Sequence, residues 1–164
     1  MSTSQPMAPL GAASPPGPLA LAGPDALRAA VGVELGPTRP VVIGADRVEA
    51  FETATGAPAV SLPAGLDGTS PGRQVPGLLL LALVNYILPR LVDVRGFQAG
   101  INYGTGPVRF PVPLAVGCSV RGSLVVVETA DVPGGVAATY RVTLIRASTG
   151  EVVCVADSLA RYLF

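Results

Sequence analysis

Apolar and polar residues alternate from residue 97 onward, and this two-residue period is typical of β-strands. Tyr, Val and Leu at 140, 142 and 144, for example, alternate with Thr and Arg at 139, 141 and 143, so the second face meets water or a partner. The predicted strands cover residues 97–104, 108–110, 119–128, 136–147 and 151–163. Short connections rich in turn residues, at 131–135 and 148–150, predict an antiparallel sheet.

A second pattern precedes the strands. Residues 78–91 are Leu-rich at nearly every position, which predicts a helix that is buried on all sides. Pro76 and Gly77 stand at its start, and Pro89 falls in its last turn and should strain or end it. Asn85 is a polar residue within this run, and its amide would need a hydrogen-bond partner, because an unpaired buried amide costs about 1–3 kcal/mol.

The first part of the chain has weaker signals. Residues 25–33 predict a short helix with Asp25 as a possible cap, and residues 39–43 predict a strand. A second short helix is expected to start at Asp46 as N-cap and to end at Gly56.

Two stretches rich in Pro, Gly, Ser and Ala separate these elements. We expect residues 1–24, with six prolines, to form a flexible tail, and residues 57–73 to form a loop. Residues 25–164 then make one α+β domain in which a twisted antiparallel sheet wraps a central apolar helix.

Composition agrees with a single globular domain. Apolar residues make up 49% of the 164 residues and charged residues 13%. Eleven arginines balance eleven acidic residues, so we expect no nucleic-acid partner. The longest apolar run, residues 75–88, contains Pro76 and Asn85 and is shorter than the ~20 residues of a membrane-spanning helix. No secretory signal is recognisable either, so we expect a cytoplasmic protein that does not enter membranes.

The chain contains no histidine, which changes the range of chemistry open to it. Ser-His-Asp and Cys-His nucleophiles and histidine-based zinc sites are excluded. The two cysteines, Cys118 and Cys154, lie in strand-like runs without metal spacing, so we expect free thiols rather than a disulfide. We expect no metal and no cofactor.

A family resemblance appears in two consecutive segments. Ala-Gly-Ile-Asn-Tyr-Gly at 99–104 and Val-Arg-Phe-Pro-Val-Pro at 108–113 resemble the MaoC-like hydratases and dehydratases, which are hot-dog proteins. Supporting segments are Thr-Gly at 55–56, Pro-Gly at 76–77 and Ala-Arg-Tyr at 160–162, within a resemblance over residues 38–163. The resemblance implies a central helix wrapped by an antiparallel sheet, a dimer of hot dogs, and acyl thioesters of coenzyme A or acyl carrier protein as substrates.

The chain departs from the family at the residues that carry its chemistry. The family's catalytic Asp and His correspond to Ala57 and Leu62, and a further family His corresponds to Pro76. Hydration of an enoyl thioester needs a placed base and acid, and Ala and Leu supply neither. Gly77 matches the place where the family binds the thioester carbonyl at backbone N–H groups, although Pro76 has no N–H of its own.

Five polar residues remain as candidates, each with a plain structural alternative. Asn85 is a substrate contact or a locally bonded core amide, and Asn102 lies on the strand beside the helix. Tyr103 packs in the core or points its hydroxyl at substrate. Arg109 pairs with a carboxylate or binds a thioester-linked phosphate. Asp67 is a turn residue or, as a weaker candidate, a relocated base.

Three functional hypotheses follow. In the first, a repurposed MaoC-like protein holds an acyl or polyketide-like chain in an apolar tunnel and promotes its cyclisation or isomerisation. In the second, the chain is the non-catalytic subunit of a heteromeric hydratase or dehydratase. The third is a hot-dog thioesterase that uses Asp67. The expected partners are an acyl-CoA, an acyl carrier protein conjugate or another hydrophobic small molecule, and a second hot-dog chain, identical or sibling.

Overall fold

The computed structural model describes residues 17–62 and 72–164. Its main sheet is built from β2 (Glu34–Leu35), β3 (Val41–Val42), β7 (Ala99–Arg109), β8 (Ser119–Val132), β9 (Gly135–Arg146) and β10 (Val152–Leu163). The strand order is β2-β8-β9-β10-β7, with β3 also on β8, and every pair is antiparallel. The α+β architecture and the antiparallel sheet are therefore confirmed.

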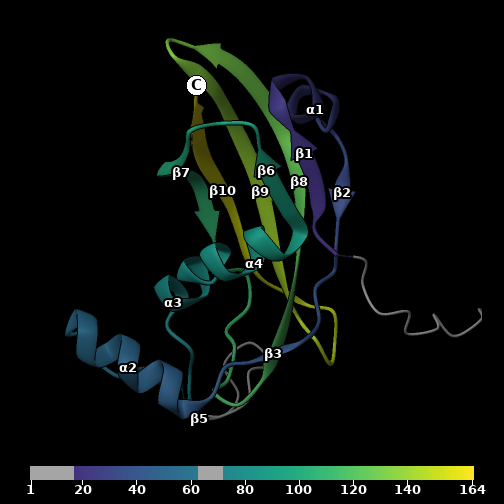
Figure 1. Cartoon of the computed structure of the whole chain (residues 1–164). Coiled ribbons are helices and arrows are strands. Elements are labelled where there is room, and N and C mark those ends of the chain that lie inside the picture. The colour runs from purple at the N-terminus through teal and green to yellow at the C-terminus, as the bar shows by residue number, and fades with distance from the viewer. Residues whose placement is uncertain (1–16, 63–71) are drawn as a thin grey trace, which may run out of the picture.

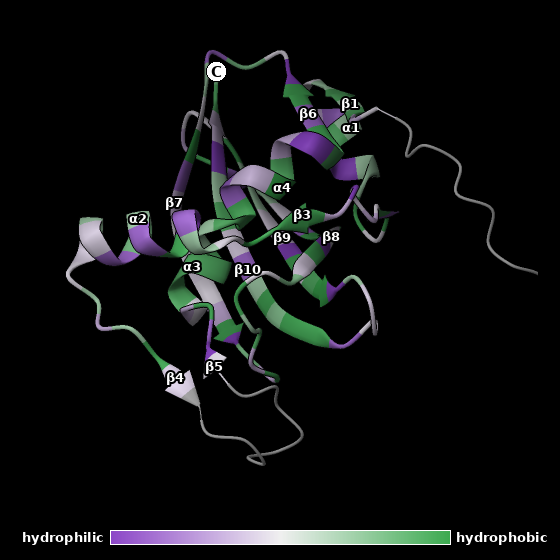
Figure 2. Cartoon of the chain, turned by 90° about the horizontal axis from the view of Figure 1, so that it is seen from below, coloured by the Kyte–Doolittle hydropathy of each residue, from purple (hydrophilic) through white to green (hydrophobic). Residues whose placement is uncertain are grey.

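The central helix lies across one face of this sheet (Figure 1). It consists of α3 (Gly77–Ala82) and α4 (Val84–Leu91), separated at Leu83. Its buried residues, Leu79, Leu80, Leu83, Val84, Ile87 and Leu91, join the core cluster formed with the inner face of the sheet. Figure 2 shows α3 mostly in the colour of hydrophobic residues, whereas α2 (Ala45–Thr55) is paler.

The helix is not buried on all sides, which corrects the expectation. Leu78 is 64% exposed, and Ala82, Asn85 and Pro89 are exposed as well. Spacings of four, three and four residues place these positions on one face of the helix. The buried residues of the helix face the sheet core, and the described part of the chain leaves this stripe exposed.

The helix packs tightly against the sheet at Gly122 of β8. A Cβ atom on Gly122 would lie 2.5 Å from Cγ2 of Ile87 on α4. The same residue accepts a hydrogen bond from the Thr38 N–H (2.8 Å) and donates its own N–H to the Thr38 hydroxyl oxygen (3.1 Å). A residue without a Cβ lets the Ile87 side chain, strand β8 and the segment before β3 meet here.

The N-terminal expectations need correction. Within the predicted tail, β1 (Leu19–Ala22) pairs in parallel with β6 (Val92–Arg95), and Leu21 is 4% exposed. Burial of Leu21 and four backbone pairs hold a segment whose composition alone indicated flexibility. α1 (Gly23–Ala29) follows at once, so Asp25 lies in its first turn, where it pairs with Arg28, and is not the cap.

Other boundaries differ as well. The strands expected at 97–104 and 108–110 are one strand, β7, because pairing with β10 continues through irregular register shifts. The expected loop at 57–73 contains the strand pair β4 (Ser61–Leu62) and β5 (Gly72–Arg73). α2 begins after Gly44 and not at Asp46, whereas its predicted end at Gly56 is confirmed by a left-handed φ of 69°.

The remaining expectations concern cysteines and membranes. Cys118 and Cys154 are both free thiols. None of the helices in residues 17–62 and 72–164 has both the length and the apolar character that crossing a membrane requires.

Candidate functional site

Two neighbouring cavities lie between the central helix and strands β7 and β10. Their volumes are about 100 and 190 Å³, and both are lined by Asn85, Asn102 and Ser158. The other lining residues are Leu81, Ala82, Val84, Thr105 and Ala156 in the smaller cavity, and Leu88, Pro89, Gly100, Ile101, Ala160 and Tyr162 in the larger one. We call the two together the helix–β7 cavity. It brings together two of the sequence-predicted candidates, Asn85 and Asn102.

Asn102 is held in one orientation by its strand. Its amide oxygen accepts the N–H of Gly104 (3.2 Å), and its amide nitrogen donates to the Ser158 hydroxyl oxygen (3.1 Å). Ser158 is 2% exposed, on the inner face of β10. An amide has two N–H donors and a hydroxyl has one, so one hydrogen of each group remains for an acceptor beyond the described residues.

Asn85 differs from the expectation of a buried, locally bonded amide. Asn85 is exposed on the stripe of α4 described above, and its side-chain amide makes no hydrogen bond to another described residue. Asn85 lies outside the buried face of the helix, on the side where the helix meets β7, so the apolar run alone did not indicate its exposure. Its amide is thus available at the rim of the cavity.

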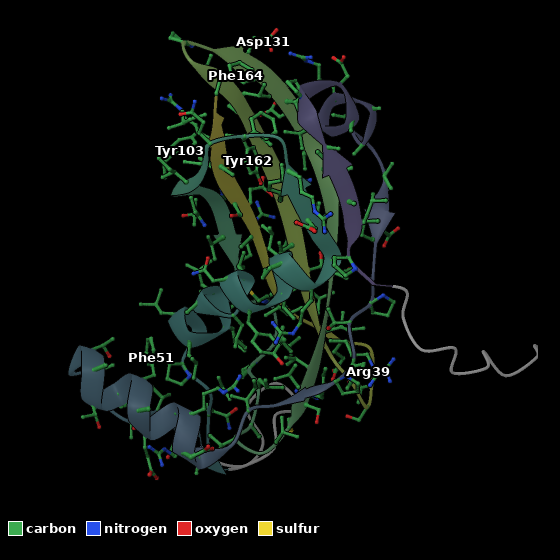
Figure 3. All side chains as sticks on the ribbon, in the orientation of Figure 1. Arg39, Phe51, Tyr103, Asp131, Tyr162 and Phe164 are labelled. Atoms are coloured by element: carbon green, nitrogen blue, oxygen red, sulfur yellow. The ribbon has the colours of Figure 1, made fainter. Side chains whose placement is uncertain are left out.

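Sequence reasoning missed the buried tyrosine pair. The Tyr140 and Tyr162 hydroxyl oxygens are 2.8 Å apart, and Tyr162 also lines the larger cavity. Figure 3 places Tyr162 within the sheet and Tyr103 out on the β7 side. Burial raises the pKa of both tyrosines, and the contact with Tyr162 raises that of Tyr140 further. The inward period of β9 and β10 was the available signal, because it places both rings on the core face.

The chemistry of the helix–β7 cavity follows from these groups. It offers amides and hydroxyls, and no carboxylate lies among its described lining residues. The raised pKa keeps Tyr162 protonated near neutral pH, so it is a hydrogen-bond donor or acceptor and not a base. The arrangement can bind and polarise a carbonyl or hydroxyl, but it holds no group poised to remove a proton.

The other candidates on β7 lie elsewhere. Tyr103 is 50% exposed and sits 5.0 Å from the Arg161 guanidinium, so it neither packs in the core nor reaches the cavity. Arg109 makes no ion pair with a carboxylate of the described residues. It lines a different cavity, next to the bidentate pair of Arg141 with Asp157 (2.8 and 2.9 Å).

The positions that the resemblance singled out lie around the start of the helix and the end of α2. Gly77 begins α3, and the Phe110 ring covers it so closely that a Cβ on Gly77 would lie 2.9 Å from the ring. Ala57 follows the α2 C-cap, where its N–H meets the Thr55 hydroxyl (3.3 Å). Leu62 belongs to β4, and Asp67 lies outside the described residues.

The core contains ionisable side chains, so the pH dependence of its stability above neutral pH tests whether they are buried. Burial raises the pKa of the Cys154 thiol from 9.0 to about 11, and the two tyrosines shift in the same direction. Above pH 9 the unfolded chain loses protons that the folded chain keeps, so stability should fall by up to about 1.4 kcal/mol per pH unit for each group. Urea unfolding from pH 7.5 to 10.5 measures this decline.

The matched control is Cys154→Val, which keeps an apolar side chain at the site. Its decline should begin about one pH unit higher, where tyrosine ionises in the unfolded chain. Equal curves for the two proteins would show that the thiol is not protected by burial.

Comparison with known proteins identifies proteins of similar sequence. The chain is 33% identical over 144 residues to the 3-hydroxyacyl-thioester dehydratase Z of Mycobacterium tuberculosis strain H37Rv, and the match covers 84% of this chain and 93% of the relative. The same identity and coverage hold for the protein of that name from Mycobacterium bovis. No profile of a protein family matches the chain.

Solved structures share the fold at lower identity. A MaoC-like dehydratase from Rhodospirillum rubrum has a TM-score of 0.62 at 18% identity, covering 82% of this chain and 94% of that one. The (R)-hydratase from A. caviae has a TM-score of 0.59 at 20% identity, with 79% and 94% covered. The HadBC complex of Mycobacterium tuberculosis, a 3R-hydroxyacyl-ACP dehydratase, gives 0.64 at 17% identity, with 80% and 96% covered. With the wrapped central helix, the β7 segment and a 33% identical dehydratase in agreement, the chain belongs to the MaoC-like hot-dog family of hydratases and dehydratases.

Proposed function

We propose that this chain is the non-catalytic, acyl-thioester-binding subunit of a heteromeric MaoC-like hydratase or dehydratase. The helix–β7 cavity carries the proposal, because its polar groups are neutral and its described lining residues contain no base. A chain without histidine can bind the substrate there, while a sibling chain supplies the proton transfers.

The surface beside the cavity supports a second subunit. β7 ends the sheet, and across its 11 residues most side chains are exposed, including Ile101 at 48%. The uncovered stripe of the central helix, with Leu78 at 64% exposure, adds an apolar surface. A long open edge and an exposed apolar patch mark a surface that a partner covers.

Relatives whose names describe complexes favour a heteromeric assembly. HadBC is a complex, and the ChsH1-ChsH2 complex from Mycobacterium tuberculosis has a TM-score of 0.57 at 16% identity, with 80% of this chain and 97% of that one covered. Nothing in the described cavity favours the cyclisation considered from the sequence. A thioesterase would rest on Asp67, which lies outside the described residues.

Individual residues of the cavity have separate roles in this proposal. The remaining hydrogens of Asn102 and Ser158 are donors for the thioester carbonyl oxygen, and Asn85 lies at the rim. The apolar walls contributed by Leu81, Val84 and Leu88 hold the acyl chain away from water. The thioester is that of coenzyme A or of an acyl carrier protein, and we place the reaction in the cytoplasm.

Binding of an unreactive acyl thioester tests the proposal. The thioether analogue of octanoyl-CoA is titrated into the purified chain and followed by calorimetry. We expect saturable binding at one site per chain with a negative heat-capacity change, because an apolar chain is buried. A chain that binds neither this analogue nor octanoyl-pantetheine would contradict the proposal.

A further inference from the structure

The hydroxyl groups of Tyr140 and Tyr162 meet above two alanines on the inner face of the sheet. In the register of β9 and β10, Tyr140 is opposite Ser158, and Tyr162 lies four residues further along β10. The two hydroxyl oxygens are nonetheless 2.8 Å apart, so the two side chains lean toward each other along the strands. The midpoint between them is the pair Ala138↔Ala160, whose small side chains leave the space in which the hydroxyl groups meet.

This meeting point borders the helix–β7 cavity. The larger part of the cavity is lined by Ser158, Ala160 and Tyr162, which are successive inward positions of β10. Tyr162 is 9% exposed, and its ring centroid lies 5.3 Å from that of Phe97. A Cβ on Gly100 would be 3.1 Å from Cε1 of Tyr162, so the ring is confined from the β7 side as well. Because its hydroxyl end leans toward Ala160, the hydroxyl group of Tyr162 stands at the wall of the cavity.

The hydrogens of the two tyrosines can be assigned from burial. Two hydroxyl groups carry two hydrogens, and one of them lies between the two oxygens. Tyr140 is 0% exposed, and among the described residues its hydroxyl group bonds only to Tyr162. If Tyr162 were the donor, the Tyr140 hydrogen would be left in the core without an acceptor, which is unfavourable. Tyr140 is therefore the donor, and the hydrogen of Tyr162 is left for an acceptor in the cavity.

We propose that the Tyr162 hydroxyl group donates a hydrogen bond to an oxygen atom within the acyl chain, so that the ligands of this cavity are acyl thioesters oxygenated along the chain. The inference rests on the proposed function, in which Asn102 and Ser158 hold the thioester carbonyl. Burial raises the pKa of both tyrosines, so the donated hydrogen is present at neutral pH.

The register of β10 indicates where along the chain this oxygen lies. The tyrosine hydroxyl groups stand above Ala160, two residues and therefore roughly 7 Å from Ser158. With carbon–carbon bonds of about 1.5 Å, an extended chain covers this distance in about six bonds, which places the second oxygen near carbon 7. An oxygen at the 3-position of the acyl chain would lie too close to the thioester carbonyl to reach Tyr162.

Two isomeric thioesters test this recognition, because they differ only in where the second oxygen lies. The pair is 7-oxo-octanoyl-CoA and 4-oxo-octanoyl-CoA, each titrated by calorimetry into the full chain. We expect the 7-oxo isomer to bind roughly tenfold more tightly, the upper range for one neutral hydrogen bond. Tyr162→Phe should remove this preference by weakening binding of the 7-oxo isomer alone. The inference is overturned if the unmodified protein shows no preference for the 7-oxo isomer, or if Tyr162→Phe retains that preference.

Tyr140→Phe is the matched control variant. It breaks the same hydrogen bond and removes the same kind of oxygen atom, but from a residue that does not line the cavity. The hydroxyl group of Tyr162 and its hydrogen remain, so the preference for the 7-oxo isomer should be retained. Equal loss of the preference in both variants would show that the pair acts only through the packing of the sheet, and the inference would fall. Thermal melts confirm that each variant is folded.

Binding of octanoyl-CoA separates failure of this inference from failure of the proposed function. If octanoyl-CoA binds and the two oxo isomers bind equally well, the inference is overturned and the proposed function stands. If none of the three thioesters binds, the proposed function is contradicted, and the inference that rests on it is overturned as well.

Discussion

Replacing Gly122 by alanine is expected to lower the free energy of unfolding by about 1–3 kcal/mol, the usual range for overpacking a core. The new Cβ would stand 2.5 Å from Cγ2 of Ile87, a methyl group on the branched Cβ of a side chain that is 1% exposed. The helix and strand must therefore separate, and the two hydrogen bonds between Gly122 and Thr38 lengthen. Urea unfolding monitored by circular dichroism measures the loss.

A second strand glycine provides the control. A Cβ on Gly104 of β7 would meet its nearest neighbour, a Leu159 methyl, at 3.9 Å, so Gly104→Ala should change stability little. The double variant Gly122→Ala, Ile87→Ala should lose less free energy of unfolding than the two single variants lose in sum. The reason is that shortening Ile87 frees the space that the new Cβ at position 122 needs. Simple additivity would show that the helix does not rest on this glycine.

Replacing Asn102 by leucine is expected to weaken binding of the octanoyl thioether analogue by about tenfold, the upper range for losing a neutral hydrogen bond. The change removes the donor to Ser158 and the acceptor of the Gly104 N–H, so the polar side of the cavity loses its alignment. Calorimetry with folded protein gives the dissociation constant.

Tyr103→Phe, one residue along the same strand, is the control because its side chain stacks with Arg161 outside the cavity. Its affinity should equal that of the unmodified protein. If Asn102→Leu binds equally well, the thioester does not lie at this part of the cavity.

The sequence predicted those elements whose pattern is local. The alternation at 139–144 reappears as buried Tyr140, Val142 and Leu144, and Gly56 ends α2 as expected. The two segments that carried the family resemblance lie on β7 and the turn after it. Strand period and glycine conformation depend on neighbouring residues, so one chain is enough to read them.

Features set by distant contacts were not predictable in the same way. β1 is ordered because Leu21 is buried in the core and because the β1 backbone pairs with β6, more than 70 residues away (Leu21↔Val94). Asn85 sits on an apolar helix, yet its exposure depends on which face the sheet covers. The contact between Tyr140 and Tyr162 joins two strands, and the approach of Arg47 on α2 to Tyr86 on α4 joins two helices; the strand period indicated that both tyrosines face the core, but not that they meet.

Steady-state hydration of octenoyl-CoA by the purified chain, alone and co-purified with a hot-dog chain that carries the Asp and His, tests the proposed function most directly. We expect no turnover above the uncatalysed rate for the chain alone. We also expect a stable heteromer that turns over the substrate, with a higher KM when this chain carries Asn102→Leu. Turnover by the chain alone at a rate typical of enzymes would contradict the proposed function, because the described cavity contains no base to support such a rate.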